Sequence, residues 1–124
     1  MPKVVLIVED SETCVETLEI AFETIPDLIC RSARNTKEAL AYLAGTEQPS
    51  ALVTDLNLKK GSGFDLIRNV RADIRYSAMP ILLISGDSDP DLATKAMAAG
   101  ASAFFAKPYS PAAVRRTLKG FLCP

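Results

Sequence analysis

The chain has 124 residues, of which 48% are hydrophobic, with 14 basic and 15 acidic side chains and no histidine. This length is typical of one domain, and we expect residues 1–124 to fold as one unit around its own core. The nearly balanced charge gives no reason to expect binding to nucleic acid or to an anionic membrane. The lack of histidine excludes a Ser–His–Asp triad, a Cys–His dyad, a histidine metal site and a phosphohistidine on this chain.

The three cysteines, Cys14, Cys30 and Cys123, are widely spaced and form no Cys-x-x-Cys motif. This pattern predicts free thiols in a reducing compartment. The first apolar run, residues 4–8, is too short for a signal peptide and far too short for a membrane span, which needs about 20 residues. We therefore expect a soluble cytoplasmic protein.

Two hydrophobic patterns alternate along the chain. Short apolar runs predict strands that are buried on both faces, and apolar residues at helical spacing predict amphipathic helices. In chain order the predicted elements are a strand at 4–8, a helix at 11–25, a strand at 28–32, a helix at 36–43, a strand at 51–54, a helix that carries Leu66, Ile67 and Val70, a strand at 81–84, a helix at 90–99, a strand at 103–106 and a helix at 111–122.

Residues that favour helix ends support several of these boundaries. Ser11, Thr36 and Ser110 are predicted N-caps, because a hydroxyl oxygen can accept a hydrogen bond from an amide of the first turn. Asp89-Pro90 combines a cap with a proline at the first helical position, and Gly100 is predicted to end the same helix.

This alternation predicts an α/β fold, a single doubly wound domain in which helices cover both faces of a five-stranded parallel sheet. Right-handed crossovers leave few topologies for such a sheet. All of its strands end at the same edge, and binding sites in these folds lie beyond the carboxyl ends of the strands.

Polar side chains stand where four of the predicted strands end: Glu9, Asp10, Asp55, Ser85 and Lys107. Three carboxylates at one edge repel one another unless a cation lies between them, and Mg²⁺ favours one or two carboxylates together with water. A lysine and a hydroxyl complete a set that suits phosphoryl transfer, in which the protein positions groups and neutralises charge. Each residue alone has an ordinary structural explanation, but their joint arrival at one edge favours a functional site.

Four segments resemble the motifs of response regulator receiver domains of the chemotaxis-regulator type, which act in bacterial two-component signalling. They are Val8-Glu9-Asp10, Thr54-Asp55-Leu56-Asn57-Leu58 with the following Gly61-Ser62-Gly63, Ile84-Ser85-Gly86, and Phe104-Phe105-Ala106-Lys107-Pro108. The resemblance covers essentially the whole chain. It implies the flavodoxin-like fold, with five parallel strands in the order 2-1-3-4-5 and five helices.

The resemblance also implies roles for the acidic residues at the predicted edge. Asp55 would be the phosphoacceptor. Mg²⁺ (or Mn²⁺) would be bound by Asp10, by Asp55 and by the backbone carbonyl of Asn57, with Glu9 acting through water.

The same resemblance implies that Lys107, the Ser85 hydroxyl and the backbone N–H of Gly86 bind the phosphoryl group. The small Gly86 would leave room for the donor, and a cis peptide bond would join Lys107 to Pro108. Ser85 and Phe104 would form a switch, in which Ser85 moves toward the phosphoryl group and Phe104 turns inward. This movement would remodel the face of the fourth helix, fifth strand and fifth helix.

Two surface features bear on partners. Acidic residues recur at helical spacing on the outer side of the first helix: Glu12, Glu16, Glu19 and Glu23. They indicate either a solvated face or an acidic docking surface, beside which Ile20 is expected to be exposed. The fourth helix is predicted to be anchored mainly by Leu92 and Met97, which suits an element that shifts between two packings.

The sequence therefore predicts a receiver that takes its phosphoryl group from a histidine kinase or a histidine phosphotransfer protein. It would act as a single-domain regulator or phosphorelay intermediate, with a downstream protein as target. It would catalyse its own phosphorylation and dephosphorylation without being an enzyme that turns over a separate substrate.

Three alternatives are open at this point. The first is a receiver-like interaction module that is never phosphorylated. A flavodoxin-like cofactor module is disfavoured because the loop after the first strand begins with Glu9 and Asp10, which repel phosphate in the absence of a metal. A Mg²⁺-dependent aspartyl-phosphate phosphatase is disfavoured because Asn57 stands where such enzymes have a second acid.

Overall fold

Strands and helices alternate along the chain, as the hydrophobic pattern predicts. The protein is described by a computed structural model, which covers residues 2–123, so that the two end residues of the predicted domain lie outside the described range. The elements are β1 (Lys3–Val8), α1 (Glu12–Phe22), β2 (Leu28–Ala33), α2 (Thr36–Leu43), β3 (Ala51–Asp55), α3 (Gly63–Ala72), the 3₁₀ turn η1 (Ile74–Tyr76), β4 (Ile81–Ser85), α4 (Leu92–Ala99), β5 (Ala103–Ala106) and α5 (Pro111–Leu122).

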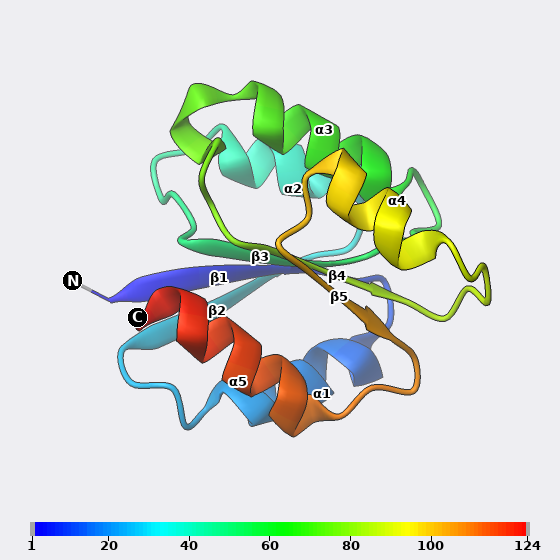
Figure 1. The fold of residues 1–124 in the computed structure, drawn as a ribbon. Helices are drawn as coiled ribbons and strands as arrows, with labels where there is room; N and C mark the ends of the chain where they lie inside the picture. Colours follow the sequence, from blue (N-terminus) through cyan, green and yellow to red (C-terminus); the bar gives the residue numbers. More distant parts are fainter. Residues whose placement is uncertain (1, 124) are drawn as a thin grey trace.

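The five strands form one parallel sheet in the order β2-β1-β3-β4-β5, which confirms the predicted fold class. Figure 1 shows α2, α3 and α4 on one face of this sheet and α1 and α5 on the other. Every residue of β3 and β4 is buried. Burial on both faces explains why these strands appear in the sequence as unbroken apolar runs.

The sheet separates two hydrophobic cores. Successive side chains of a strand point to opposite faces. Leu6 of β1 therefore packs in the core beneath α2, α3 and α4, whereas its neighbour Ile7 packs in the core beneath α1 and α5. Both side chains are at most 1% exposed.

The predicted caps of α1 and α5 are confirmed. Ser11 Oγ accepts a hydrogen bond from the amide of Cys14 at 3.4 Å, and Ser110 Oγ accepts one from the amide of Ala113 at 3.2 Å. Gly100 ends α4 with a φ of 114°, a left-handed conformation that favours glycine.

The predicted ends of α1 and α2 need correction. Asn35 rather than Thr36 caps α2, because Asn35 has the extended backbone of an N-cap and its side-chain oxygen accepts the Glu38 amide hydrogen at 2.9 Å. Thr36 is already helical. Helix α1 ends at Phe22, and Ile25 is buried in the turn that follows.

Helix α4 differs from the prediction in its start and in its anchors. It begins at Leu92 rather than at residue 90, because Asp89 accepts the Asp91 amide hydrogen at 2.9 Å and holds residues 89–91 in a turn. Met97 is 52% exposed, and Ala96 is buried instead. Ala96 lies one turn beyond Leu92 on the same side, whereas Met97 lies about 140° around the helix from Leu92.

The 3₁₀ turn η1 was not predicted, since three residues are too few for a periodic pattern. Its Tyr76 is 2% exposed and donates its hydroxyl hydrogen to the carbonyl of Leu43 at 2.7 Å. The turn therefore joins the chain after α3 to the end of α2.

None of the helices within residues 2–123 is long and apolar enough to cross a lipid bilayer. Even α5 has only 12 residues, compared with the roughly 20 that a membrane span needs.

Candidate functional site

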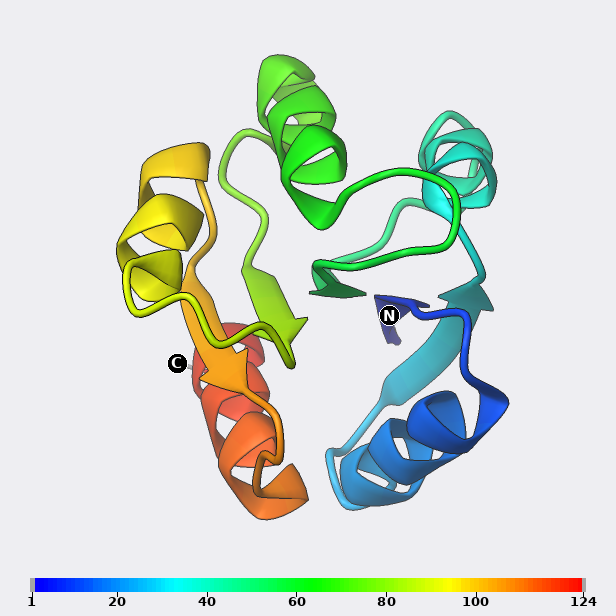
Figure 2. The ribbon, with the colours of Figure 1, turned by 90° about the vertical axis from the view of Figure 1, so that its right-hand side faces the viewer.

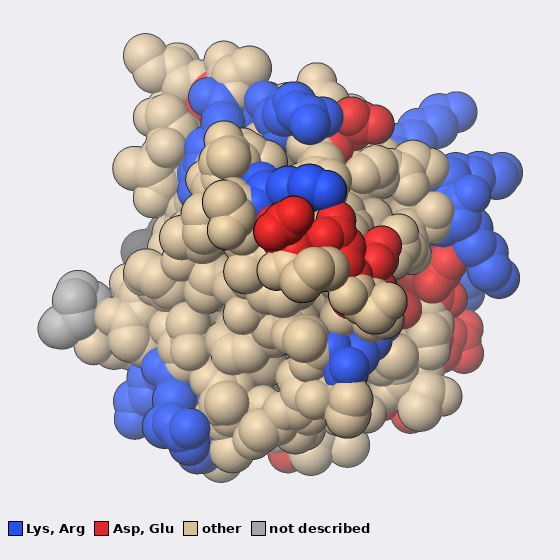
Figure 3. Space-filling model, turned by 45° about the vertical axis from the view of Figure 1, so that its right-hand side comes forward, with Lys and Arg blue, Asp and Glu red and all other residues tan. Residues whose placement is uncertain are grey.

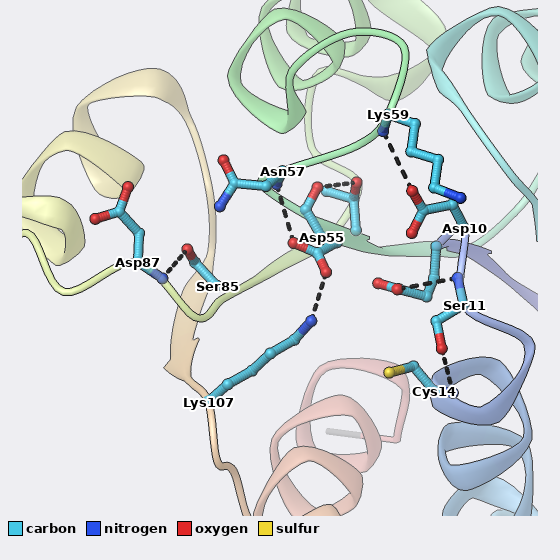
Figure 4. Close-up of polar contacts among 11 residues, drawn as sticks. Asp10, Ser11, Cys14, Asp55, Asn57, Lys59, Ser85, Asp87 and Lys107 are labelled. Carbon is cyan, nitrogen blue, oxygen red and sulfur yellow. Dashed lines mark hydrogen bonds and ion pairs between the residues drawn. The ribbon is translucent and has the colours of Figure 1, made fainter.

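The ends of four strands bring the predicted site residues to one edge of the sheet. Figure 2 looks onto this edge, and Figure 4 shows the side chains that meet there. Glu9 and Asp10 follow β1, Asp55 is the last residue of β3, Ser85 is the last residue of β4, and Lys107 follows β5. Residues far apart in the sequence thus become neighbours because parallel strands end at a common edge.

Asp55 lies at the centre of the site and is 5% exposed. Its Oδ2 lies 2.6 Å from the Nζ of Lys107, and its Oδ1 accepts the backbone N–H of Asn57 at 3.0 Å. Burial opposes ionisation of Asp55, but the proton held on Glu9, the Lys107 ammonium and the Asn57 N–H together keep its pKa below the ordinary value. The Asp55 carboxylate is therefore ionised at neutral pH.

Glu9 is 8% exposed, and its Oε1 accepts the Ser11 amide hydrogen at 3.2 Å. Burial, reinforced by the nearby Asp55 carboxylate, raises the pKa of Glu9 to about 8. The site thus avoids a second buried negative charge by keeping a proton on Glu9.

Asp10 is half-buried, and its Oδ2 accepts the backbone N–H of Lys59 at 3.2 Å. Within residues 2–123, no three acidic or cysteine side chains already converge as a metal site. The donor set nevertheless fits a hard divalent cation, because Glu9, Asp10, Asp55 and the Asn57 carbonyl all offer oxygen. The proton retained by Glu9 indicates the cost of gathering these carboxylates without a cation.

Ser85 is fully buried, and its Oγ accepts the backbone N–H of Asp87 at 3.0 Å (Figure 4). The neighbouring Gly86 is exposed, and a Cβ at this position would lie 3.7 Å from Cδ of Lys107. A larger side chain at residue 86 would therefore lie against Lys107 at the mouth of the site.

Phe104 is half-buried and packs against the core beneath α4. It is the second residue of β5. Farther along, the Lys107–Pro108 peptide bond is cis.

Two backbone amides that hold site residues were not predicted from the sequence, and the reason for a glycine at position 63 became clear only in the structure. The Lys59 amide binds Asp10, and the Asp87 amide binds Ser85, but backbone donors leave no residue-type signal in a sequence. Gly63 was expected only from the resemblance, and a Cβ there would lie 2.6 Å from the backbone oxygen of Asp55. The glycine therefore lets the start of α3 pass close to the end of β3.

Comparison with known proteins agrees with this geometry. Residues 5–119 match the family model described as the response regulator receiver domain. A chemotaxis protein CheY homolog of Campylobacter jejuni is 26% identical over 117 residues, which are 94% of this chain and 90% of that protein.

Solved structures share the fold. A putative response regulator from Chloroflexus aurantiacus matches with a TM-score of 0.89 and 29% sequence identity over 100% of both chains. The Mn²⁺-bound form of response regulator Rcp1 matches with a TM-score of 0.81 and 21% identity, over 96% of this chain and 91% of that one. The strand-end site, the sheet order and the family match lead to one conclusion: this chain belongs to the response regulator receiver domain family of two-component signalling.

Proposed function

We propose that this receiver accepts a phosphoryl group on Asp55, from a histidine kinase or a histidine phosphotransfer protein, in a reaction that depends on Mg²⁺ or Mn²⁺. The observation that carries the proposal is the state of the Asp55 carboxylate. It is almost fully buried and is held between the Nζ of Lys107 and the backbone N–H of Asn57 at the edge of the sheet.

The proposed step forms one bond and breaks one bond. A carboxylate oxygen of Asp55 attacks the phosphorus atom of the partner's phosphohistidine, the P–N bond breaks, and its electron pair stays on the imidazole nitrogen. Lys107 neutralises charge on the transferring oxygens, and the Ser85 hydroxyl donates a hydrogen bond to one of them. Hydrolysis by water would later remove the group as inorganic phosphate.

Asp10, Asp55 and the backbone carbonyl of Asn57 would hold the metal ion, with Glu9 acting through water. The ion would supply positive charge to the phosphoryl oxygens and to the crowded carboxylates. Asp10 would exchange its hydrogen bond from the Lys59 amide for this interaction. The existence of a Mn²⁺-bound structure with the same fold supports the assignment.

The acidic side of α1 is the proposed docking surface for the phosphodonor protein. It borders a hollow of about 190 Å³ lined by Glu9, Asp10, Glu12, Val15, Glu16, Glu19, Ser32 and Arg34. Ile20 is 65% exposed, as predicted, and offers an apolar contact. Figure 3 shows that acidic and basic side chains are interspersed on the face of the molecule that it presents.

Charge reversal tests this docking surface. Glu16→Lys or Glu19→Lys is expected to slow transfer from the phosphohistidine of the partner at least about tenfold more than transfer from acetyl phosphate, because only the protein donor uses α1. Asp65→Lys on α3 makes the same change of net charge away from α1 and is the control. Equal slowing with both donors would count against the assignment.

The proposed output face is formed by α4, β5 and α5. Met97 is 52% exposed and Phe121 is 42% exposed, while Phe104 lies half-buried near α4. We expect phosphorylation to move Phe104 inward and so to change the face seen by a downstream protein.

We also propose a cytoplasmic location, supported by three free cysteines and testable by cell fractionation.

The direct test is the intact mass of the protein after incubation with acetyl phosphate, with and without Mg²⁺. We expect one added phosphoryl group that requires both Mg²⁺ and Asp55, so that Asp55→Asn remains unmodified. Asp65→Asn, at an exposed acid at the start of α3, should be phosphorylated like the parent protein.

An adduct that forms on Asp55→Asn would place the phosphoacceptor elsewhere. No adduct in the parent protein, together with no binding of the stable analogue beryllofluoride, would favour the interaction module that is never phosphorylated.

A further inference from the structure

The loop between β3 and α3 is closed at its base. The amide of Gly63 donates to the carbonyl of Leu56 at 2.8 Å, and Asn57 forms an antiparallel bridge with Ser62. Leu58 is 8% exposed and packs in the core beneath α2, α3 and α4. These contacts hold the two ends of the loop close together.

The residues between these ends, Lys59, Lys60 and Gly61, are exposed, and we call them the loop tip. The backbone N–H of Lys59 donates to Asp10 Oδ2 at 3.2 Å (Figure 4). Within residues 2–123, no other hydrogen bond joins the tip to the rest of the protein. The position of the tip therefore depends strongly on one acceptor atom.

Gly61 brings the loop tip against the first turn of α2. Its φ is 107°, a left-handed conformation that favours glycine, and a Cβ at this position would lie 2.5 Å from Thr36 Oγ1. That hydroxyl oxygen is buried and has no hydrogen-bond partner in the described part of the chain. The tip thus rests on Thr36 by packing, and a side chain at residue 61 would push it away.

The loop tip also borders a hollow of about 180 Å³ lined by Asp10, Arg34, Asn35, Lys59 and Lys60. The hollow leaves room for the tip to move once the hydrogen bond to Asp10 is released. Lys59 and Lys60 carry ammonium groups, which repel a cation bound nearby. An experiment on cation binding must therefore separate the effect of the Lys59 N–H from that of the Lys59 charge.

Asp10 has two competing partners. Its Oδ2 accepts the Lys59 N–H in the structure, and the proposed function makes its carboxylate a ligand of a divalent cation. Both partners are attracted to the same negative charge, so that an interaction with one weakens the interaction with the other. Once released, the exposed Lys59 N–H can donate to water instead.

We propose that the loop tip is a latch on Asp10, closed by the Lys59 N–H in the metal-free protein and opened when Asp10 turns to a divalent cation. The proposal rests on the proposed function, because that function makes Asp10 a metal ligand. The closed latch lowers the affinity of the site for the cation, since the hydrogen bond must be given up. By linkage, a change that weakens the closed tip strengthens cation binding by the same factor.

The base of the loop stays closed while the latch opens. Asn57, whose carbonyl is a further proposed ligand, belongs to this base. The release is therefore confined to residues 59–61 and moves two lysines at the mouth of the site. Cation binding would thus change the surface that a phosphodonor meets before any phosphoryl group is transferred.

The first test measures the dissociation constants of Mg²⁺ and Mn²⁺ by titration calorimetry, without a phosphodonor. Lys59→Pro removes the N–H and the side-chain charge, whereas Lys59→Ala removes the same charge and keeps the N–H. We expect Lys59→Pro to bind each cation about three- to tenfold more tightly than Lys59→Ala. Equal binding would overturn the latch. So would weaker binding by Lys59→Pro, because the N–H would then hold Asp10 in place for the cation.

A second variant opens the latch without touching the Lys59 amide. Gly61→Ala places a Cβ against Thr36, and we expect it to bind both cations at least about threefold more tightly than the parent protein. Gly120→Ala is the matched control, since a Cβ there meets no atom within 4 Å. Equal affinities in Gly61→Ala and Gly120→Ala would contradict the linkage between the tip and the cation.

The third test uses the parent protein alone and follows amide hydrogen exchange by NMR, with a chelator and then with saturating Mg²⁺. The Lys59 amide should exchange at least about threefold faster with Mg²⁺, because its acceptor is withdrawn. The amide of Gly63, bonded to Leu56 at the base of the loop, should not change. Slower or unchanged exchange at Lys59 would overturn the latch.

These outcomes are distinct from a failure of the proposed function. A protein that shows the expected affinities and exchange but gains no phosphoryl group on Asp55 would contradict phosphoryl transfer and leave the latch standing. A protein that is phosphorylated on Asp55 with unchanged exchange at Lys59 would overturn the latch alone. A parent protein that binds neither cation would overturn the latch together with the metal assignment.

Discussion

The carboxyl group of Glu9 shows how a buried acid at the candidate site affects the stability of the fold. It is buried beside Asp55, and its pKa is raised from 4.5 to about 8. Between these two pH values the folded protein holds a proton that the unfolded chain releases. The stabilisation from this proton is complete below about pH 4.5 and is lost as the pH rises through 8.

We therefore expect the metal-free protein to lose stability as the pH rises from about 5 to 9, and Glu9→Gln to lose much less. At pH 9 the variant should be at least about 1 kcal/mol more stable than the parent protein, because one pKa unit corresponds to about 1.4 kcal/mol. Urea unfolding in the presence of a chelator measures this difference, with Glu23→Gln, at an exposed acid just after the end of α1, as control. Parallel pH profiles for the parent protein and Glu9→Gln would contradict the shifted pKa.

At the scale of elements, short connections hold the helices in place as much as their apolar faces do. The turn η1 buries Tyr76, whose hydroxyl satisfies the carbonyl of Leu43 at the end of α2. A buried carbonyl that loses its donor costs more than the hydrogen bond contributes. The packing of α2 beside α3 therefore depends on a residue that belongs to neither helix.

We expect Tyr76→Phe to lower the free energy of unfolding by about 1–3 kcal/mol, because it leaves the Leu43 carbonyl buried without a donor. Tyr42→Phe is the matched control, since the Tyr42 hydroxyl bonds to Glu47 at the surface and its loss should cost less than about 1 kcal/mol. Chemical denaturation of both variants measures the difference. Equal effects would mean that the Tyr76 hydroxyl contributes through something other than this buried bond.

At the scale of the whole molecule, the central strands couple the two cores. Leu6 and Ile7 are adjacent in β1 and are buried on opposite faces of the sheet. Loss of β1 would therefore disrupt both cores at once. We therefore propose that residues 1–124 unfold as one cooperative domain.

Leu6→Ala and Ile7→Ala should each lower the free energy of unfolding by about 2–5 kcal/mol, and each should preserve a single transition. Ile20→Ala, at a side chain that is 65% exposed, should change stability by less than about 0.5 kcal/mol. Calorimetry checks both magnitude and cooperativity. Two separate transitions, each shifted by only one of the core variants, would divide the chain into independent units.

The sequence by itself determined the fold class, the strand order implied by the family motifs, and the edge at which the candidate site lies. The physical reason is that strands buried on both faces must be continuous apolar runs, and the residues that follow parallel strands meet at one edge. The sequence alone therefore predicts that five residues meet at one edge: Glu9, Asp10, Asp55, Ser85 and Lys107. The caps at Ser11 and Ser110 were likewise local features, set by a hydroxyl and an amide three residues apart.

Only the tertiary structure decided how those groups are held. The Lys59 amide binds Asp10 across 49 residues of sequence, and Arg71 reaches Gly100 across 29. The buried side of α4 is the side that carries Leu92 and, one turn later, Ala96, so that Ala96 took the place expected for Met97. Hydrophobic periodicity reports which residues leave water, but backbone donors and long-range contacts have no periodicity and become defined only when distant segments pack together.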